Sequence, residues 1–365
     1  MTDLLYFSLF YSFIISLLIF GLCRSIRKHK HIQSDAKKFI SVIIACKNEE
    51  MNIGKLIQSL KDQSYDKEFY EVIIADDNST DSTATKIKES IQHDANFHYV
   101  FVAPESFSDI LGKKKAITTA VQIAKGNILA FTDADCIPER DWLSDINQAF
   151  EKCDFYAGYS PLILNKYQNI KNLERASIFA VCAGSLGLRT PLTCTARNMA
   201  YTRDLWDKVE GFKGIGHILS GDDDLMLLKM RNFTNRYHFS FNPNAIVISE
   251  EKNNLSKQIN QETRRASKFK YYPLYIKLLI VSIAIYYVLL LYNFIASFFT
   301  MSVSCGLLFA IASKLILEFL LLFIFLNNFK KTSYLKTFLI AELLYIPYFL
   351  FFGIKGTLGK YKWKS

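Results

Sequence analysis

The sequence predicts an α/β protein in which a mixed, Rossmann-like sheet is joined to transmembrane helices at both ends. Three observations lead to this prediction. Short β-branched apolar runs alternate with helical stretches over residues 39–150, a pattern typical of a doubly wound sheet. Polar clusters follow several of these runs, at the strand ends where such sheets bind ligands. Long apolar segments lie near both ends of the 365-residue chain.

The first predicted element is a transmembrane anchor over residues 1–24. Residues 4–23 carry no charge and are long enough, at about 1.5 Å per residue, to cross a hydrocarbon core of about 30 Å. A cleaved signal peptide is the alternative, but the segment lacks a basic start and a small-residue cleavage site. Six basic residues follow at once, so the positive-inside rule predicts a cytoplasmic location for the next region: Arg24, Arg27, Lys28, Lys30, Lys37 and Lys38.

Charge and cysteine content narrow the class of protein. The net charge of +10 at pH 7 gathers beside the apolar segments, where anionic lipid headgroups attract it. We therefore expect the membrane as a partner, and no nucleic acid, because no motif for DNA or RNA is present. The seven cysteines form no C-x-x-C pair, which argues against a zinc site or a disulfide framework.

The main domain is predicted over residues 38–250. Its first part repeats a strand and a helix, and the polar residues after each strand mark the ligand-binding edge of the sheet. Residues 155–249 contain both helix-like and strand-like segments without a regular alternation, and a further helix begins near Asp222. The predicted strands are 39–46, 70–75, 97–102 and 127–132, and the predicted helices are 53–63, 82–92, 113–124 and 141–150.

The C-terminal part is predicted to return to the membrane. Residues 251–273 suit an amphipathic helix on the bilayer surface, and residues 274–354 contain spans at 275–299 and 303–326. A third segment, 337–353, is barely long enough to cross. Crossing would place the basic tail, 355–365, outside and against the charge rule, so a re-entrant segment is the alternative to the crossing that we favour slightly.

One charged pair lies inside the second of these predicted spans. Lys314 and Glu318 are four residues apart, so they fall on one helix face and should pair with each other away from lipid. We expect this pair to be structural.

Two acidic clusters carry most of the chemical signal. Asp133 and Asp135, which are separated by one residue, follow an apolar strand and can bind one hard cation, such as Mg²⁺ or Mn²⁺. Solvated loop acids are the alternative interpretation of such a pair. Three successive aspartates, Asp222, Asp223 and Asp224, repel one another and serve no folding purpose, so they favour a general base, with Asp224 as a helix-start charge.

The order of the motifs resembles family 2 inverting glycosyltransferases with a GT-A fold. The similar segments are residues 41–49, 76–81, 112–116, 133–135, 196–201, 221–223 and the Gln261-x-x-Arg264 pair. Each motif alone is weak, whereas seven in one order are specific. The resemblance implies a membrane-anchored transferase that uses a nucleoside-diphosphate sugar, most simply a UDP-sugar, and Mg²⁺ or Mn²⁺.

The resemblance also implies roles for individual residues. Asp77 first, and Asp76, would contact the base and ribose. Asp135 would ligate the metal directly, and Asp133 would contact metal or ribose. The base falls on Asp223, and Asp222 would orient the acceptor, although a shift of the motif by one residue would exchange the two. Further donor-side residues are Ala45, Lys47, Glu49, Lys113, Gln261, Arg264 and Arg265, and acceptor-side residues are Arg197, Asn198 and Tyr201.

Several of these roles have structural alternatives. The three lysines at 113–115 could form a solvated face, and Arg197, Asn198 and Tyr201 could be packing residues. Arg265 stands where the motif of polymerising relatives has Trp, which makes a processive polysaccharide synthase less favoured than transfer to a lipid acceptor. A catalytically silent scaffold and a metal-dependent nucleotidyltransferase are two further candidate functions. We expect an integral protein of the cell (inner) membrane with its catalytic domain in the cytoplasm.

Overall fold

The computed structural model describes residues 2–29, 36–107, 109–163, 169–250 and 255–358. The chain divides into two compact units. The sheet unit comprises residues 24–165 and 185–251, and the helical unit comprises residues 1–23, 166–184 and 252–365.

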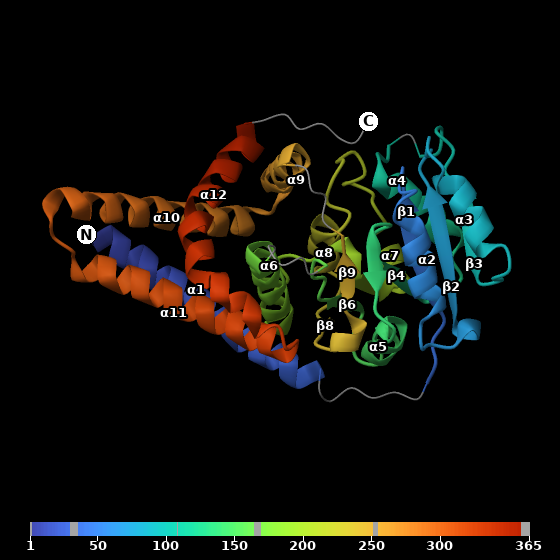
Figure 1. Ribbon diagram of the computed structural model, residues 1–365, viewed down its shortest axis with the longest axis horizontal. Coiled ribbons are helices and arrows are strands. Elements are labelled where there is room, and N and C mark those ends of the chain that lie inside the picture. The colour runs from blue at the N-terminus through green and yellow to red at the C-terminus, as the bar shows by residue number, and fades with distance from the viewer. Residues whose placement is uncertain (1, 30–35, 108, 164–168, 251–254, 359–365) are drawn as a thin grey trace. The chain divides into compact units, whose positions relative to one another are not determined.

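A seven-stranded mixed sheet forms the centre of the sheet unit (Figure 1), in the order β3-β2-β1-β4-β7-β6-β8. The first four strands in this order run parallel, whereas β7 is antiparallel to both β4 and β6. This arrangement confirms the predicted fold class. The strands are β1 (Ile40–Cys46), β2 (Tyr70–Asp76), β3 (Phe97–Phe101), β4 (Ile128–Phe131), β6 (Phe155–Gly158), β7 (Met199–Thr202) and β8 (Tyr237–Ser240).

Helices cover both faces of this sheet. Alternate residues of each buried strand point to opposite faces, and residues such as Val42 and Ile44 pack in one core with three helices. These helices are α2 (Ile53–Lys61), α3 (Thr83–Ile91) and α5 (Trp142–Ala149). Helix α4 (Lys113–Ile123) packs on β1 and β2 through a separate buried set: Ala116, Ile117, Ala120 and Val121.

Short elements complete the sheet unit. A two-stranded antiparallel ribbon joins β5 (Cys136–Pro138) to β9 (Val247–Ser249), and Cys136 pairs with Ser249. Helices α7 (Arg203–Lys208) and α8 (Asp224–Met230) follow β7. The ribbon positions the segment that follows Asp135, because the Glu250 N–H donates a 3.3 Å hydrogen bond to the Asp135 carbonyl.

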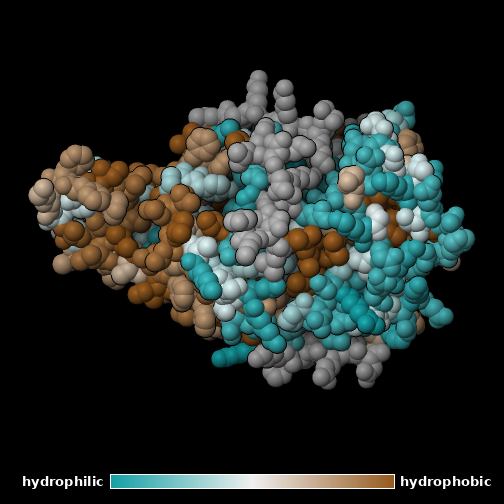
Figure 2. All heavy atoms as spheres, in the orientation of Figure 1, coloured by the Kyte–Doolittle hydropathy of each residue, from teal (hydrophilic) through white to brown (hydrophobic). Residues whose placement is uncertain are grey.

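The described part of the helical unit contains long apolar helices. Four segments are long and apolar enough to cross a membrane: Asp3–His29, Leu274–Thr300, Cys305–Asn328 and Thr332–Thr357. Their apolar side chains gather on the surface over these helices (Figure 2). The corresponding elements are α1 (Thr2–His29), α10 (Leu274–Thr300), α11 (Cys305–Asn328) and α12 (Phe338–Leu358).

The last of these helices is longer than predicted. The segment 337–353 was expected to be barely long enough to cross, yet α12 continues through Pro347 and Gly353 as one helix. A proline inside a helix removes one backbone N–H donor. In apolar surroundings, neighbouring helices and side chains can satisfy the backbone carbonyl that loses its partner. Residues 359–365 of the predicted basic tail lie outside the described residues.

Two further helices belong to the helical unit. Helix α9 (Leu255–Ser267) lies within the predicted amphipathic segment and packs along α12, where Gly356 leaves room for Ala266. Helix α6 (Asn169–Gly187) was not predicted from the sequence. In the sequence it lies between the two parts of the sheet unit, but its residues 169–184 belong to the helical unit.

The predicted pair in α11 is confirmed and has further partners. Lys314 Nζ lies 3.0 Å from Glu318 Oε2 and also contacts Glu342 of α12, which the sequence did not single out. The Tyr11 hydroxyl of α1 donates to Glu318. These charges are largely buried and paired, which is the arrangement that makes charged groups tolerable among apolar helices.

Candidate active site

Three adjacent parallel strands bring the predicted donor-side residues to one edge of the sheet. Strands β2, β1 and β4 are neighbours, and their carboxyl ends lead to Asp77, Lys47 and Asp133 respectively. Because side chains after adjacent parallel strands share one edge, these residues lie along the same rim.

The D-x-D pair provides ligand atoms for one cation. Asp133, Asp135 and Cys136 each offer an atom, and these atoms lie within 4.8 Å of one another. Two carboxylates are suitable ligands for Mg²⁺ or Mn²⁺, so the predicted metal residues fit such an ion. Cys136 was not predicted. Its thiol donates a long 3.7 Å contact to Asp135 Oδ1 and therefore helps to orient that carboxylate.

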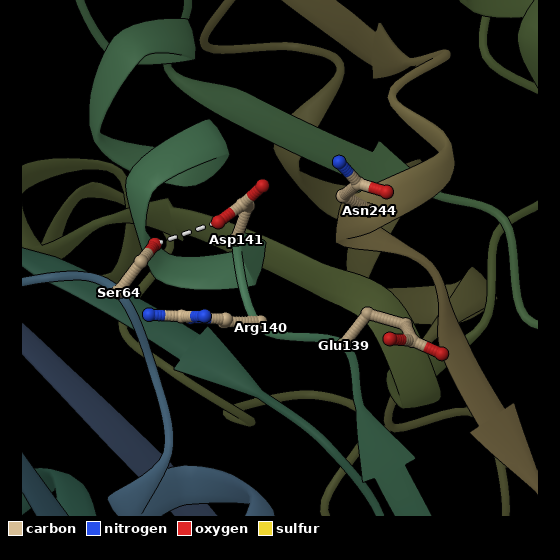
Figure 3. Close-up of a pocket in the computed structure, with 5 residues that line it drawn as sticks. All are labelled: Ser64, Glu139, Arg140, Asp141 and Asn244. Atoms are coloured by element: carbon tan, nitrogen blue, oxygen red, sulfur yellow. Dashed lines mark hydrogen bonds between the residues drawn. The ribbon is translucent and has the colours of Figure 1, made fainter.

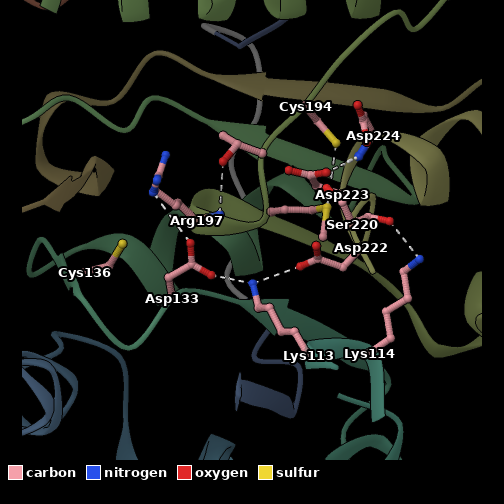
Figure 4. Close-up of polar contacts among 12 residues, drawn as sticks. Lys113, Lys114, Asp133, Cys136, Cys194, Arg197, Ser220, Asp222, Asp223 and Asp224 are labelled. Carbon is pink, nitrogen blue, oxygen red and sulfur yellow. Dashed lines mark hydrogen bonds and ion pairs between the residues drawn. The ribbon is translucent and has the colours of Figure 1, made fainter. Parts of the chain in front are cut away.

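Lys113, at the start of α4, connects the D-x-D pair to the triple aspartate (Figure 4). Its Nζ atom lies 2.5 Å from Asp133 Oδ1 and 2.9 Å from Asp222 Oδ2. On the other side of Asp133, Arg197 Nε lies 3.6 Å from Oδ2. The two acidic clusters, far apart in the sequence, therefore belong to one site.

The electrostatics of this network keep both cations charged. Burial lowers the pKa of Lys113, but the carboxylates of Asp133 and Asp222 raise it more, so the net shift is upward. Burial likewise opposes the charge of Arg197, but Asp133, Cys136, Asp135 and Asp223 together outweigh it, so that the pKa of Arg197 is raised.

Lys114 positions the loop before the triple aspartate. Its side chain is 1% exposed, and its ammonium donates to the carbonyls of Ile215, Ile218 and Ser220 at 2.6, 2.9 and 2.9 Å. Three acceptors satisfy the three donors of an ammonium group. The interpretation of residues 113–115 as a solvated face is therefore wrong for Lys113 and Lys114.

The three aspartates differ in their surroundings. Asp222 is partly exposed and pairs with Lys113. Asp223 is the N-cap of α8, and its carboxylate accepts a 2.7 Å hydrogen bond from the Asp224 N–H. Asp224 is 3% exposed and begins the helix, as predicted for a helix-start charge. Gly221 has φ of +84°, a left-handed conformation that favours glycine and allows the turn into this cluster.

The two aspartates after β2 also differ. Asp76 is 1% exposed, and it accepts hydrogen bonds from the Ser79 N–H and the Tyr99 hydroxyl at 3.0 and 3.1 Å. Asp77 is only half-buried, and burial raises the pKa of its carboxyl although Lys47 opposes the shift. This arrangement supports Asp77 rather than Asp76 as the residue available to a ligand.

The remaining predicted nucleoside-side residues follow β1. Ala45, Lys47 and Glu49 are each partly exposed. The Glu49 carboxylate accepts a 2.9 Å hydrogen bond from the Asn52 amide, which holds it at the start of α2.

Two of the predicted acceptor-side residues are enclosed in the core. Asn198 is 0% exposed, accepts from Trp142 Nε1 at 2.9 Å and donates to the carbonyls of Tyr159 and Ala245. Tyr201 is also 0% exposed, and its ring stacks on Trp206. These contacts favour the packing alternative for both residues. Arg197 alone of the three is partly exposed.

The burial of Asn198 leads to a testable prediction. Asn198→Ala leaves one buried donor and two buried carbonyls without these partners, so we expect it to lower the unfolding free energy by about 2–4 kcal/mol. If the residue packs and does not bind the acceptor, the KM for acceptor of the folded fraction should stay unchanged. Thermal unfolding and initial-rate kinetics measure the two effects, and a raised KM with normal stability would contradict the packing role.

The last group of predicted donor-side residues lies in α9 of the helical unit. Gln261, Arg264 and Arg265 occupy one stretch of this helix, and Arg265 pairs with Glu262 at 2.7 Å. Their predicted contact with the leaving diphosphate stays a prediction.

A polar hollow of about 460 Å³ lies elsewhere on the sheet unit (Figure 3). It is lined by Ser64, Glu139, Arg140, Asp141 and Asn244, and Ser64 Oγ donates to Asp141 at 2.8 Å. None of these residues belongs to the predicted site.

Comparisons with known proteins point to one family. A family model described as glycosyl transferase family 2 matches residues 41–214. Glycosyltransferase AglE of Haloferax volcanii is 33% identical over 198 residues, 51% of this chain and 59% of that protein. A β-monoglucosyldiacylglycerol synthase of Nostoc is 32% identical over 126 residues, 34% of this chain and 26% of that protein. The chain thus aligns with less than two thirds of the length of each relative.

A solved structure shares the fold. The mannosyltransferase PcManGT of Pyrobaculum calidifontis, in complex with GDP-Man and Mn²⁺, aligns with a TM-score of 0.52 and 15% identity. The alignment covers 97% of this chain and 99% of that chain, and it supports the GT-A fold.

Proposed function

We propose that the chain transfers a sugar from a nucleoside-diphosphate donor to a lipid or lipid-linked acceptor, because residues 41–214 match the model of glycosyl transferase family 2. The observation that carries this proposal is the Lys113 contact with both Asp133 and Asp222. A donor-side carboxylate and a candidate base cluster therefore lie close enough to act on one substrate pair.

The donor side uses the rim formed by β1, β2 and β4. Asp77 accepts hydrogen bonds from the base and ribose, with a UDP-sugar as the first candidate donor. Asp133 and Asp135 would hold Mg²⁺ or Mn²⁺, and their ligand geometry fits such an ion. A cation bound there would supply positive charge to stabilise the diphosphate leaving group. The structural neighbour was solved with Mn²⁺ and GDP-Man, which agrees with a divalent cation and a nucleoside-diphosphate sugar but does not distinguish a UDP-sugar from a GDP-sugar.

The transfer proceeds by a single displacement. The Asp223 carboxylate takes the proton from an acceptor hydroxyl while the oxygen of that hydroxyl forms a bond to the anomeric carbon. The bond from that carbon to the diphosphate breaks, and the electron pair leaves with the diphosphate. Asp222 orients the acceptor, and Arg264 and Arg265 stabilise the leaving group. One attack from the opposite side inverts the anomeric carbon.

The acceptor is proposed to lie in the membrane. Four described helices are long and apolar enough to cross a bilayer, which would keep the enzyme beside lipid. The name of the Nostoc relative indicates that its product is a β-monoglucosyldiacylglycerol, which is a glycolipid. We therefore propose an integral protein of the cell membrane, with its sheet unit in the cytoplasm as the basic flank of α1 indicates.

Mass spectrometry of lipids tests the proposed function. Cells that contain the intact chain, supplied with UDP- and GDP-sugars, should accumulate a lipid that carries one added hexose or hexosamine, and cells with the Asp223→Asn variant should not. A product that is only long polysaccharide would instead support the processive synthase. Identical lipids and normal cell function with both chains would support the silent scaffold.

The raised pKa of Asp77 leads to a prediction with a defined sign. A carboxyl whose pKa is raised by folding favours its neutral form, so its stabilising effect is present below the unfolded pKa of about 4 and is lost as the pH rises through the folded value. Asp77→Asn should therefore raise the melting temperature at pH 7 but not at pH 3. The same variant should weaken donor binding, since it removes an acceptor of hydrogen bonds.

Two measurements check this prediction about Asp77. Thermal unfolding at the two pH values gives the stability, and titration with UDP in the presence of Mn²⁺ gives the affinity. A melting temperature that falls more at pH 7 than at pH 3 would show that the ionised carboxylate is stabilising and that the sign is wrong.

A further inference from the structure

The Lys113 ammonium forms ion pairs with both acidic clusters, through Asp133 and through Asp222. The side chains of Lys113, Asp133 and Asp222 keep 23%, 25% and 15% of their exposed area. Water therefore screens these ion pairs only partly, and a change of charge at one carboxylate should alter the ion pair of Lys113 with the other.

The backbone next to Lys113 is held in place by the contacts of Lys114. Lys114 fastens the start of α4 to the carbonyls of Ile215, Ile218 and Ser220, just before the triple aspartate. Arg197 Nε lies 3.6 Å from the second oxygen of Asp133, at ion-pair distance. With the start of α4 fixed by Lys114, the flexible side chain of Lys113 is the part that can change partners.

We propose that Lys113 is a positioning residue that bridges Asp133 and Asp222 and releases both when the donor side is occupied, and so couples occupancy of the donor side to the freedom of the acceptor side. This inference rests on the function proposed above. A divalent cation and the Lys113 ammonium carry charges of the same sign, so they compete for the Asp133 carboxylate. As Asp133 turns to the cation, Lys113 becomes available to donor diphosphate oxygens. Asp222 then loses its counter-ion and can accept a hydrogen bond from the acceptor.

The first test is Mn²⁺ binding to the full chain in detergent without nucleotide, measured by electron paramagnetic resonance. Lys113→Gln removes the competing charge but keeps a hydrogen-bond donor, and we expect it to bind Mn²⁺ about fivefold to tenfold tighter. Lys113→Met serves the same purpose should the Gln variant fail to fold. The control is Lys115→Met, because Lys115 donates an exposed bond to the Pro104 carbonyl and its loss should leave Mn²⁺ affinity unchanged.

The second test separates the coupling through Lys113 from the direct electrostatic effect of the Asp222 charge on the cation. Asp222→Asn leaves Lys113 with Asp133 alone, so it should weaken Mn²⁺ binding at least about threefold more in the natural background than in the Lys113→Gln background. Equal effects in both backgrounds, or unchanged or weaker Mn²⁺ binding by Lys113→Gln, would overturn the inference. Because Mn²⁺ binding needs no sugar transfer, a chain that shows this coupling but forms no product would reject only the proposed function.

Discussion

Asp223→Asn is expected to lower kcat at least about 100-fold, since a general base in the right position contributes roughly 10²–10⁴-fold to a rate. Asparagine keeps a side-chain oxygen that can accept the 2.7 Å hydrogen bond from the Asp224 N–H, and it is as good an N-cap as aspartate. The substitution therefore removes the basic group while the start of α8 is preserved. Initial rates of nucleoside-diphosphate release measure the effect.

The control variants define what this result means. Asp204→Asn changes an exposed aspartate of α7, 71% exposed and paired with Lys208, and should leave kcat unchanged. Asp222→Asn should mainly raise the KM for acceptor, since Asp222 is proposed to orient the acceptor. If Asp222→Asn abolishes turnover and Asp223→Asn does not, the roles of the two aspartates are exchanged.

Lys114→Met is expected to have the largest effect on stability among single substitutions near the site. The three carbonyls of residues 215, 218 and 220 would lose a buried charged donor, and each such bond contributes about 1.5–3 kcal/mol. Because some of this loss is recovered by relaxation, we expect a decrease of about 3–5 kcal/mol in unfolding free energy, or roughly 6–15 °C in melting temperature.

The activity of Lys114→Met should fall together with its stability, because the loop that Lys114 holds leads directly to Asp222 and Asp223. The matched control is Lys115→Met, which removes a partly exposed lysine from the same helix turn. Intrinsic tryptophan fluorescence during heating compares the two variants. Equal melting temperatures would show that the contacts of Lys114 with the loop carry no net free energy.

The sheet and its ligand-binding edge could be predicted because local patterns determine them. Residues 40–46 form a short β-branched apolar run, and the apolar residues of the helix 53–61 recur with the helical period, so both elements were predicted within two residues. The D-x-D pair could likewise be recognised, since two carboxylates at a strand end are separated by only one residue.

Further features depend on contacts between distant residues, and no local pattern encodes them. Lys113 and Lys114 look like surface residues in the sequence, but their partners come from a loop about a hundred positions later. Asn198 is polar and yet buried, because Trp142 and two carbonyls satisfy its amide. Helix α6 was missed because its apolar residues show no clear period of either kind.

The most direct test of sugar transfer at this site is the stoichiometry of the reaction in vitro. The full chain in detergent is incubated with Mn²⁺, a panel of UDP- and GDP-sugars and a membrane lipid extract, and both products are quantified by mass spectrometry. We expect one nucleoside diphosphate released for each lipid that gains a single sugar, with the anomeric configuration opposite to that of the donor. Release of pyrophosphate, or a product that retains the donor configuration, would contradict the assignment of Asp223 as the base of a single displacement.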